Sequence, residues 1–254
     1  MKISVITVCL NSRDYIEDCL QSVIRQNTDN YEHIIIDGVS NDGTLEIIEK
    51  NNSPRQIVIS EPDKGIYYAM NKGVDAASGD VIGFLNADDV LASPSILADI
   101  TTFINNTEVD IVYGNIEYRE RNQFSKVTRM WNSGPFSKKK LRAGWFPPHP
   151  TFYCTRSLYK NYGNYNVKYK IAADVDLMFR FLSKNEVMVG YFDKTMVHMR
   201  TGGVSNNSIF GSYRQFSEVR MALKNNLNYT NVLSYLLNRI FLRIKQRLAG
   251  YGAR

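Results

Sequence analysis

Residues 79–89 read Gly-Asp-Val-Ile-Gly-Phe-Leu-Asn-Ala-Asp-Asp, a short apolar run that ends in two adjacent carboxylates. The run from Val81 to Leu85 predicts a buried strand, because strands covered on both faces are continuously apolar. Asp88 and Asp89 follow at the carboxyl end of that strand, where open α/β sheets bind ligands. Such an acidic pair can hold a hard divalent cation and, through it, phosphate oxygens. The alternative is that both aspartates begin a turn or cap the next helix, where Asp is common.

The N-terminal part of the chain alternates between apolar strands and amphipathic helices. Strands are expected over Ile3–Cys9, Tyr31–Ile36 and Gln56–Ser60, with helices over about Arg13–Gln26, from Thr44 onward and over Gly65–Ala77. This alternation with short connections predicts an α/β fold whose parallel sheet is covered on both faces. The later elements expected are a helix over Pro94–Asn105, a strand over Asp110–Tyr118, a helix from Ala172, and two final strands over Glu186–Asp193 and Thr195–Met199.

The composition excludes several classes of protein. Hydrophobic residues make up 44% and charged residues 22% of the 254 residues, as in an ordinary soluble globular protein. The apolar run Ile3–Leu10 lacks a small-residue cleavage signal, and no stretch approaches the roughly 20 apolar residues of a membrane span. Cys9, Cys19 and Cys154 have no metal-binding spacing, so packing roles in a reducing compartment are expected.

Polar residues follow each of the first strands, at positions where packing does not require them. They are Thr7 and Asn11, residues 37–44 and residues 61–65. Their convergence with Asp88 and Asp89 on one sheet edge favours a binding crevice over plain turns. No G-x-G-x-x-G follows the first strand and no P-loop motif occurs, which weakens the dinucleotide and P-loop interpretations. The crevice therefore suggests a nucleoside diphosphate that is held through a metal.

Three segments resemble those of family 2 glycosyltransferases. Asp37-Gly-Val-Ser-Asn-Asp-Gly-Thr44 is similar to the family's D-G-S-x-D-G-T loop, with Val39 in place of Ser. Asp63-Lys-Gly-Ile-Tyr-Tyr-Ala-Met-Asn-Lys-Gly73 resembles D-x-G-x-x-x-A-x-N-x-G, and Phe84-Leu-Asn-Ala-Asp-Asp89 resembles F-L-D-A-D-D. The resemblance implies a GT-A fold, with a Rossmann-like, mostly parallel central sheet, helices on both faces and a nucleotide-sugar donor.

The resemblance also implies roles for individual residues. It places Thr7 and Asn11 in the nucleoside pocket and Asp37 on the base, with uracil favoured. Asp63 and Lys64 would lie near the base and the ribose. Asp88 would lie near the ribose or the metal, and Asp89 would be a ligand of Mg²⁺ or Mn²⁺. Asn86 stands where the family often has Asp, which removes one charge from the motif.

A second group of candidate residues lies in the later part of the chain. Residues 172–180, Ala-Ala-Asp-Val-Asp-Leu-Met-Phe-Arg, resemble the family's G-E-D-x-D-L-x-x-R segment, which implies that Asp174 is the catalytic base. The alternative is that Asp174 stabilises the start of a helix through its dipole. Asp176 and Arg180 are expected to be structural. His198 is a candidate metal ligand or a satisfied core residue, and Arg200 is a candidate diphosphate contact.

The segment between these groups has two open interpretations. Residues 119–148 contain a polar run, the basic run Lys138–Arg142 and an aromatic, Pro-rich run that reaches Pro150. They form either a surface loop or a mobile acceptor loop, since aromatic faces stack on sugars and basic residues suit a phosphate-bearing acceptor. His149 is accordingly either a turn residue or an acceptor contact.

The positive charge of the chain is concentrated in its tail. Residues 206–254 hold eight Lys or Arg and one Glu, whereas the preceding 205 residues hold 23 basic and 24 acidic side chains. We therefore expect a glycosyltransferase domain over 1–205, with a nucleotide-sugar half (1–118) and an acceptor half (119–205), followed by basic amphipathic helices over 206–254. A helix over Asn231–Ala249 has an apolar stripe and an arginine stripe. An anionic membrane surface is favoured as its partner over packing on the domain, and nucleic acid is not expected.

The resemblance implies an inverting, metal-dependent glycosyltransferase of bacterial surface-polysaccharide synthesis. The donor would be a nucleotide-diphosphate sugar, UDP-sugar favoured, and the acceptor a glycan or a lipid-linked oligosaccharide. The expected location is the cytoplasm, peripherally on the inner face of the cytoplasmic membrane. Two alternatives remain: a sugar nucleotidyltransferase, which should carry a Gly-rich basic loop after the first strand, and a non-catalytic nucleotide-sugar-binding subunit.

Overall fold

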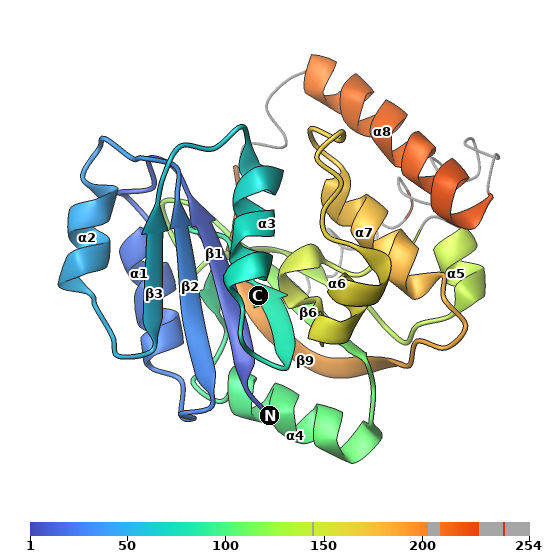
Figure 1. The fold of residues 1–254 in the computed structure, drawn as a ribbon, viewed down its shortest axis with the longest axis horizontal. Coiled ribbons are helices and arrows are strands. Elements are labelled where there is room, and N and C mark those ends of the chain that lie inside the picture. The colour runs from blue at the N-terminus through green and yellow to red at the C-terminus, as the bar shows by residue number, and fades with distance from the viewer. Residues whose placement is uncertain (144, 203–208, 229–240, 242–254) are drawn as a thin grey trace.

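The computed structural model describes every residue except 144, 203–208, 229–240 and 242–254 (Figure 1). The described strands are β1 (Ile3–Cys9), β2 (Tyr31–Asp37), β3 (Gln56–Ser60), β4 (Val81–Phe84), β5 (Val90–Leu91), β6 (Ile111–Arg119), β7 (Val127–Trp131), β8 (Tyr153–Thr155) and β9 (Val189–Arg200). The described helices are α1 (Ile16–Ile24), α2 (Thr44–Lys50), α3 (Ile66–Ala76), α4 (Ile96–Thr107), α5 (Lys138–Arg142), α6 (Arg156–Tyr162), α7 (Ala173–Leu182) and α8 (Ile209–Leu227), with a 3₁₀ turn η1 (His149–Thr151).

The strands form one mixed sheet in the order β3-β2-β1-β4-β8-β6-β9-β5, with β7 paired to β6. The first four neighbours, β3, β2, β1 and β4, are all parallel, as the alternation predicted. Every residue of β2 and β4 is buried, which explains the continuously apolar sequence of β4 and the run of three isoleucines in β2. The carboxyl ends of these four strands therefore meet at one edge, where the candidate donor residues lie.

The sheet changes direction beyond β4. Strand β8 is antiparallel to both β4 and β6, whereas β6 and β9 are parallel. The expected pair of final strands is wrong in one respect: residues 189–200 form the single strand β9, whose register against β6 shifts on either side of Asn115. Asp193 and Lys194 are exposed at this irregular pairing. Their polar side chains in the sequence suggested a turn between two strands.

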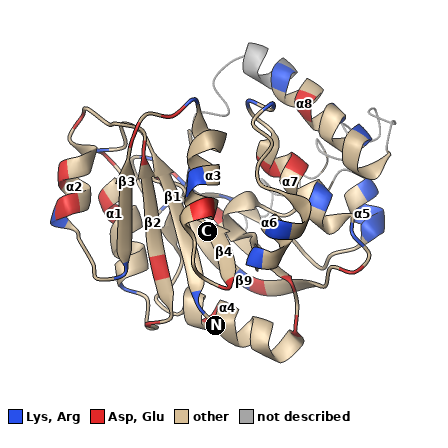
Figure 2. Cartoon of the chain, viewed as in Figure 1, with Lys and Arg blue, Asp and Glu red and all other residues tan. Residues whose placement is uncertain are grey.

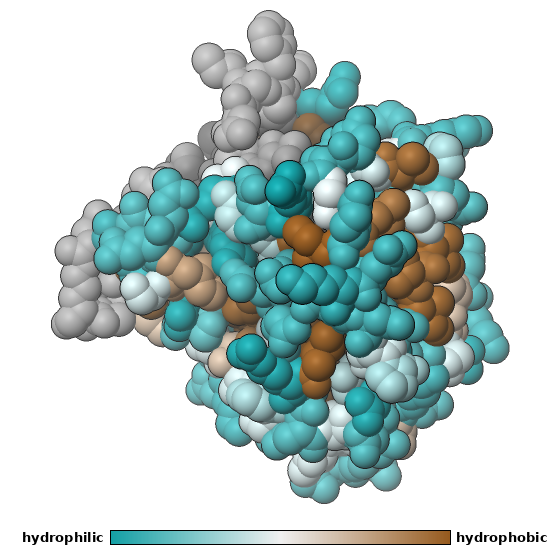
Figure 3. All heavy atoms as spheres, turned by 90° about the vertical axis from the view of Figure 1, so that its left-hand side faces the viewer, coloured by the Kyte–Doolittle hydropathy of each residue, from teal (hydrophilic) through white to brown (hydrophobic). Residues whose placement is uncertain are grey.

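Helices cover both faces of the parallel strands. Helices α1 and α2 pack with Cys9 and Ile35 on one face, through Ile16, Leu20 and Ile48. Helix α3 packs on the other face, and so closely that a Cβ added to Gly73 would lie 2.4 Å from the Ile6 side chain. At the outer edge β3 exposes Ile57 and Val58. Figure 3, viewed from that side, shows a mostly hydrophilic surface with scattered apolar patches.

The second half of the molecule is organised around α7, whose Leu177, Phe179 and Phe181 are fully buried. Helix α8 packs along α7 and buries Val219, Ala222 and Leu223 (Figure 1). Within the described residues, no helix has the length and apolarity needed to cross a bilayer. The predicted boundary at residue 205 and most of the predicted helix over Asn231–Ala249 lie outside the described residues.

Candidate active site

Asp37 and Asn11 are joined by the Ser40 hydroxyl at the carboxyl edge of the sheet. This hydroxyl accepts the Asn11 amide hydrogen at 2.8 Å and donates to Asp37 Oδ1. Asp37 Oδ2 accepts from the Ser40 amide at 3.0 Å and from the Ser60 hydroxyl at 2.7 Å. Burial raises the pKa of Asp37, but these hydrogen bonds outweigh it and hold the pKa below its usual value. Asp37 is thus a carboxylate that shapes the 38–44 loop, and Ser40 is a site residue that the sequence analysis missed.

Thr7 does not reach this loop with its side chain. It is fully buried, and its hydroxyl lies 2.9 Å from His33 Nε2 and 3.7 Å from Cys19 Sγ. These partners lie on β2 and α1, so the Thr7 side chain belongs to the interior between the sheet and that helix. The structure brings together Asn11 and Asp37, but not the Thr7 hydroxyl.

Asp63 is nearly buried and has one oxygen without a partner among the described residues. Its side chain is 9% exposed, and Oδ1 lies 2.6 Å from Lys72 Nζ. The Lys72 ammonium also lies 2.8 Å from Glu61 Oε1, and hydrogen bonds to these two carboxylates raise the pKa of Lys72. Asp63 Oδ2 is buried and accepts no hydrogen bond. It is therefore an available acceptor for a ligand N–H or O–H group, whereas Lys64 is exposed to solvent.

The two adjacent carboxylates after β4 lie in different environments. Asp89 is fully buried, and its oxygens accept from Asn86 Nδ2 at 2.7 Å and from the Arg200 amide at 3.0 Å. Burial, followed by the neighbouring Asp88 charge, raises the pKa of Asp89. Asp88 is partly exposed, and its Oδ2 lies 3.8 Å from Arg121 Nη1. Asp88 therefore presents the accessible carboxylate of the pair.

Arg200 is held by several protein contacts at this point, and its role as a diphosphate contact stays a prediction. It is buried, its Nη1 donates to the Asp88 carbonyl at 2.7 Å, and its Nη2 pairs with Asp18 on α1. Its guanidinium also lies over the Phe124 ring, 4.2 Å from the centroid. These contacts fasten the end of β9 to the loop that carries Asp88. Arg121 is the more accessible arginine: it lies 4.2 Å from the Tyr15 ring centroid and donates to the Tyr15 hydroxyl.

His198 is also engaged by neighbouring side chains. Its Nε2 lies 3.0 Å from Arg119 Nη2 and 3.4 Å from Glu117 Oε2. Burial and the Arg119 charge lower the pKa of His198 to about 4. In the described part of the chain, no three His, Cys, Asp or Glu side chains converge as a metal-binding group. Asp89 and His198 make these protein contacts in the folded chain, and their roles as metal ligands stay a prediction.

Asp88 by itself does fit a divalent cation. Mg²⁺ is commonly held by one or two carboxylates together with phosphate oxygens of the substrate, and not by a cage of protein ligands. Asp88 offers a partly exposed carboxylate, with Arg121 Nη1 3.8 Å from its Oδ2. The residues present are therefore compatible with a metal site in which Asp88 and a diphosphate together bind the cation.

Asp174 lies in the first turn of α7, beside a cluster of aromatic side chains. Its Oδ1 accepts from the Tyr67 hydroxyl of α3 at 3.3 Å. His149 lies close enough for the Asp174 charge to oppose the effect of burial, which lowers the pKa of His149. The His149 Nε2 is 2.8 Å from the Tyr165 hydroxyl, and its ring centroid is 5.4 Å from that of Phe84. Since Phe84 ends β4, this cluster connects Asp174 with the strand that leads to Asp88.

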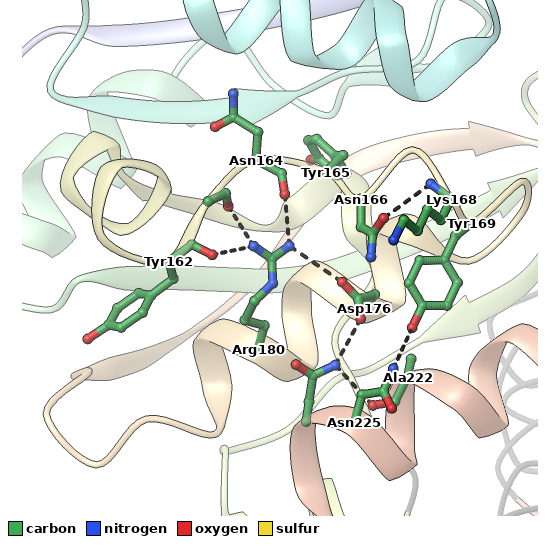
Figure 4. Close-up of polar contacts among 12 residues, drawn as sticks. Tyr162, Asn164, Tyr165, Asn166, Lys168, Tyr169, Asp176, Arg180, Ala222 and Asn225 are labelled. Atoms are coloured by element: carbon green, nitrogen blue, oxygen red, sulfur yellow. Dashed lines mark hydrogen bonds and ion pairs between the residues drawn. The ribbon is translucent and has the colours of Figure 1, made fainter.

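Asp176 and Arg180 hold neighbouring segments together (Figure 4). Arg180 donates to the carbonyls of residues 162–164, at 2.8 Å for Gly163 and for Asn164, and Asp176 accepts from Asn226 Nδ2 of α8 at 2.9 Å.

The segment 119–148 contains packed elements. It includes β7 and α5, and its Trp145 and Phe146 are buried, so their ring faces are not presented to a sugar. Lys138, Lys139, Lys140 and Arg142 form a basic patch on α5, next to α7 (Figure 2).

Known proteins similar to this chain are glycosyltransferases. A family model described as Glycosyl transferase family 2 matches residues 4–166. A PGL/p-HBAD biosynthesis glycosyltransferase of Mycobacterium bovis is 33% identical over 211 residues, which cover 81% of this chain and 80% of the relative. Chondroitin synthase of Pasteurella multocida is 29% identical over 187 residues, but these are 73% of this chain and only 19% of the synthase.

Two solved structures share the fold. The crystal structure of S. aureus TarS in complex with UDP has a TM-score of 0.66 and 21% identity, over 95% of this chain and 72% of that chain. The mannosyltransferase PcManGT of Pyrobaculum calidifontis, in complex with GDP-Man and Mn²⁺, has a TM-score of 0.64 and 15% identity, over 99% of this chain and 74% of that chain. These similarities identify the GT-A architecture and agree with the mixed sheet described above.

Proposed function

Since this chain belongs to glycosyltransferase family 2, we propose that it moves a sugar from a nucleotide-diphosphate sugar to an acceptor hydroxyl, with inversion at the anomeric carbon. A UDP-sugar is the favoured donor, and the acceptor is a glycan or lipid-linked oligosaccharide of surface-polysaccharide synthesis. One observation carries the proposal: the Tyr67 hydroxyl donates to Asp174, and the Tyr67 ring stacks on Tyr165, which contacts Phe84 at the end of the strand that leads to Asp88. One aromatic cluster thus joins the proposed proton acceptor to the proposed diphosphate site.

The donor side supports a nucleoside. A carboxylate accepts hydrogen bonds but cannot donate them, and uracil offers one ring N–H. Asp63 Oδ2 is buried and unpaired, so it is the better-placed acceptor for that N–H or for a ribose hydroxyl. Asp37 is already surrounded by Ser40, Ser60 and the weak Cys9 donor, so a base would have to replace the Cys9 contact.

The diphosphate is assigned to Asp88 and Arg121. A divalent cation, Mg²⁺ or Mn²⁺, bound by Asp88 and the donor would neutralise charge on the departing diphosphate. Arg121 lies beside Asp88 and carries a second positive charge to the same place. Because a guanidinium fits phosphate oxygens in a bidentate manner, Arg121 can orient the leaving group.

The chemistry at the acceptor is assigned to Asp174. Its carboxylate takes the proton of the acceptor hydroxyl as that oxygen attacks the anomeric carbon from the face opposite the diphosphate. The bond from the anomeric carbon to the diphosphate oxygen breaks in the same step, which inverts the configuration. The Tyr67 hydroxyl, 3.3 Å from Asp174 Oδ1, donates to the carboxylate and holds it toward the crevice.

The basic tail gives a reason to propose peripheral association with an anionic membrane on the cytoplasmic side. Residues 206–254 carry a balance of +7, and each basic residue near an anionic surface contributes about 1 kcal/mol of attraction. Cosedimentation with vesicles with and without anionic lipid tests this. Binding that is equal on neutral vesicles, or absent on both, would contradict it.

Transfer assays with Asp174→Asn test the proposed reaction. The matched control is Asp29→Asn, because Asp29 is exposed and precedes β2 at the opposite edge of the sheet. We expect Asp174→Asn to lower kcat by about 10²- to 10⁴-fold with unchanged donor affinity, and the control to behave as wild type. Donor binding without transfer in the wild type, or full activity in Asp174→Asn, would instead support a non-catalytic binding subunit or a different base.

A further inference from the structure

Helix α7 begins without a side-chain cap of its own. Its N-cap residue is Ala172, and the first amide hydrogens of any helix have no partner within that helix. Alanine cannot accept a hydrogen bond through its side chain, so the segment that leads into α7 depends on another part of the chain. Asp174 lies only two residues later, in the first turn.

The missing acceptor comes from α8. Glu218 Oε2 accepts from three consecutive backbone amides, those of Lys170 at 3.0 Å, Ile171 at 2.8 Å and Ala172 at 3.0 Å, and Oε1 accepts from Lys170 at 3.1 Å. A negative charge at this position also interacts favourably with the helix dipole. One carboxylate therefore fixes the direction in which α7 starts.

From these contacts we propose that Glu218 is a positioning residue for the transfer reaction, acting through α7 on Asp174. The inference rests on the proposed function, since it takes Asp174 as the base. It assigns part of the active site to α8, beyond residue 166 where the family-model match ends. Glu218 touches no reacting atom; it sets where the Asp174 carboxylate lies relative to the acceptor.

The neighbouring Asn226 provides a control within the same interface. Asn226 Nδ2 donates to Asp176 Oδ1 at 2.9 Å, so it also fastens α8 to α7, but on a residue that is not assigned to the chemistry. Loss of either contact weakens the packing of α8. Only loss of the Glu218 contact releases the amides just before Asp174.

The experiment compares Glu218→Ala, Glu218→Gln and Asn226→Ala in the full chain. Calorimetric titration with the donor counts binding-competent molecules, so that kcat is expressed per folded site. We expect Glu218→Ala to lose about 10- to 100-fold in kcat, as a misplaced catalytic group does, with donor affinity within about twofold of wild type. Glu218→Gln should recover most of the loss, because its amide oxygen can still accept from the backbone amides.

Asn226→Ala should keep kcat, and amide hydrogen exchange at Ile171 and Ala172 should accelerate in Glu218→Ala only. Equal loss of kcat in Glu218→Ala and Asn226→Ala, or wild-type kcat in Glu218→Ala, would overturn the inference. Absence of transfer by the wild type would overturn the proposed function instead, and hydrogen exchange would still report whether Glu218 holds these amides.

Discussion

Asn86 Nδ2 donates a hydrogen bond of 2.7 Å to Asp89 Oδ2, so the amide at the start of the acidic motif stabilises the buried carboxylate at its end. We therefore expect that Asn86→Asp, which restores the residue common in the family, destabilises this protein. The substitution removes the donor and places a second negative charge beside a buried one, for a loss of about 1–3 kcal/mol. Urea unfolding measures the loss. The exposed Asn52→Asp serves as control, and equal stability of both variants would contradict the prediction.

Because the pKa values of its three histidines are lowered, we expect the protein to lose stability in mild acid. Burial lowers the pKa of His33 to about 3 and, with the Arg119 charge, that of His198 to about 4, and it also lowers the pKa of His149. The unfolded chain binds protons near the usual pKa of 6.5, while the folded protein does not. The free energy of unfolding should therefore be fully present above pH 6.5 and fall by about 1.4 kcal/mol per histidine for each pH unit below it.

His33→Gln isolates one of these contributions. Glutamine keeps a polar group near the Thr7 hydroxyl, which lies 2.9 Å from His33 Nε2, but it does not titrate. Urea unfolding between pH 7 and pH 5 should show a shallower pH dependence for this variant. A curve parallel to that of wild type would show that His33 takes up its proton in the folded state.

We expect a substitution of Val39, in the 38–44 loop, to stabilise the protein. It is exposed and has a φ of 64°, a left-handed conformation that is unfavourable for a β-branched residue. Asparagine adopts this conformation more readily, so Val39→Asn should raise the free energy of unfolding by about 1 kcal/mol. Val39→Ile, which keeps the β-branch, should leave it unchanged. Identical melting temperatures for the two variants would argue against strain at this position.

We expect Arg121 to contribute to the binding of a nucleotide only through the phosphates of that nucleotide. Arg121→Ala removes the positive charge beside Asp88 and should weaken the binding of a nucleoside diphosphate about tenfold. The nucleoside without phosphates should bind equally well to both proteins, and Arg121→Lys should give an intermediate affinity. Equal weakening for nucleoside and diphosphate would assign Arg121 to the shape of the loop instead of the diphosphate.

Local sequence predicted the first half of the fold because its parallel strands are short apolar runs that alternate with helices. The bounds of β1 and β3 match the predicted ranges, since each strand is a short apolar run between polar turns. Strand β7 was missed because its residues are mostly half-buried and include polar side chains. The short strand β8 follows the aromatic, Pro-rich run that ends at Pro150, and it was not predicted.

The site could be predicted only as a set of loops. Sequence cannot show that Asp89 points inward and Asp88 outward, because the difference is made by Arg200, a partner 111 residues away. The contact of Glu218 with Ala172 is likewise set by packing of α8 on α7 and leaves no local pattern. Contacts of this kind appear only once the chain is folded.

The most direct test of the account is calorimetric titration of UDP, GDP, dTDP and their sugars into wild type and Asp88→Ala, with and without Mn²⁺. We expect one nucleotide sugar to bind tightly, with an affinity that requires both Mn²⁺ and Asp88. The absence of binding by any nucleotide under every condition would contradict the assignment of this crevice to a nucleotide-sugar donor.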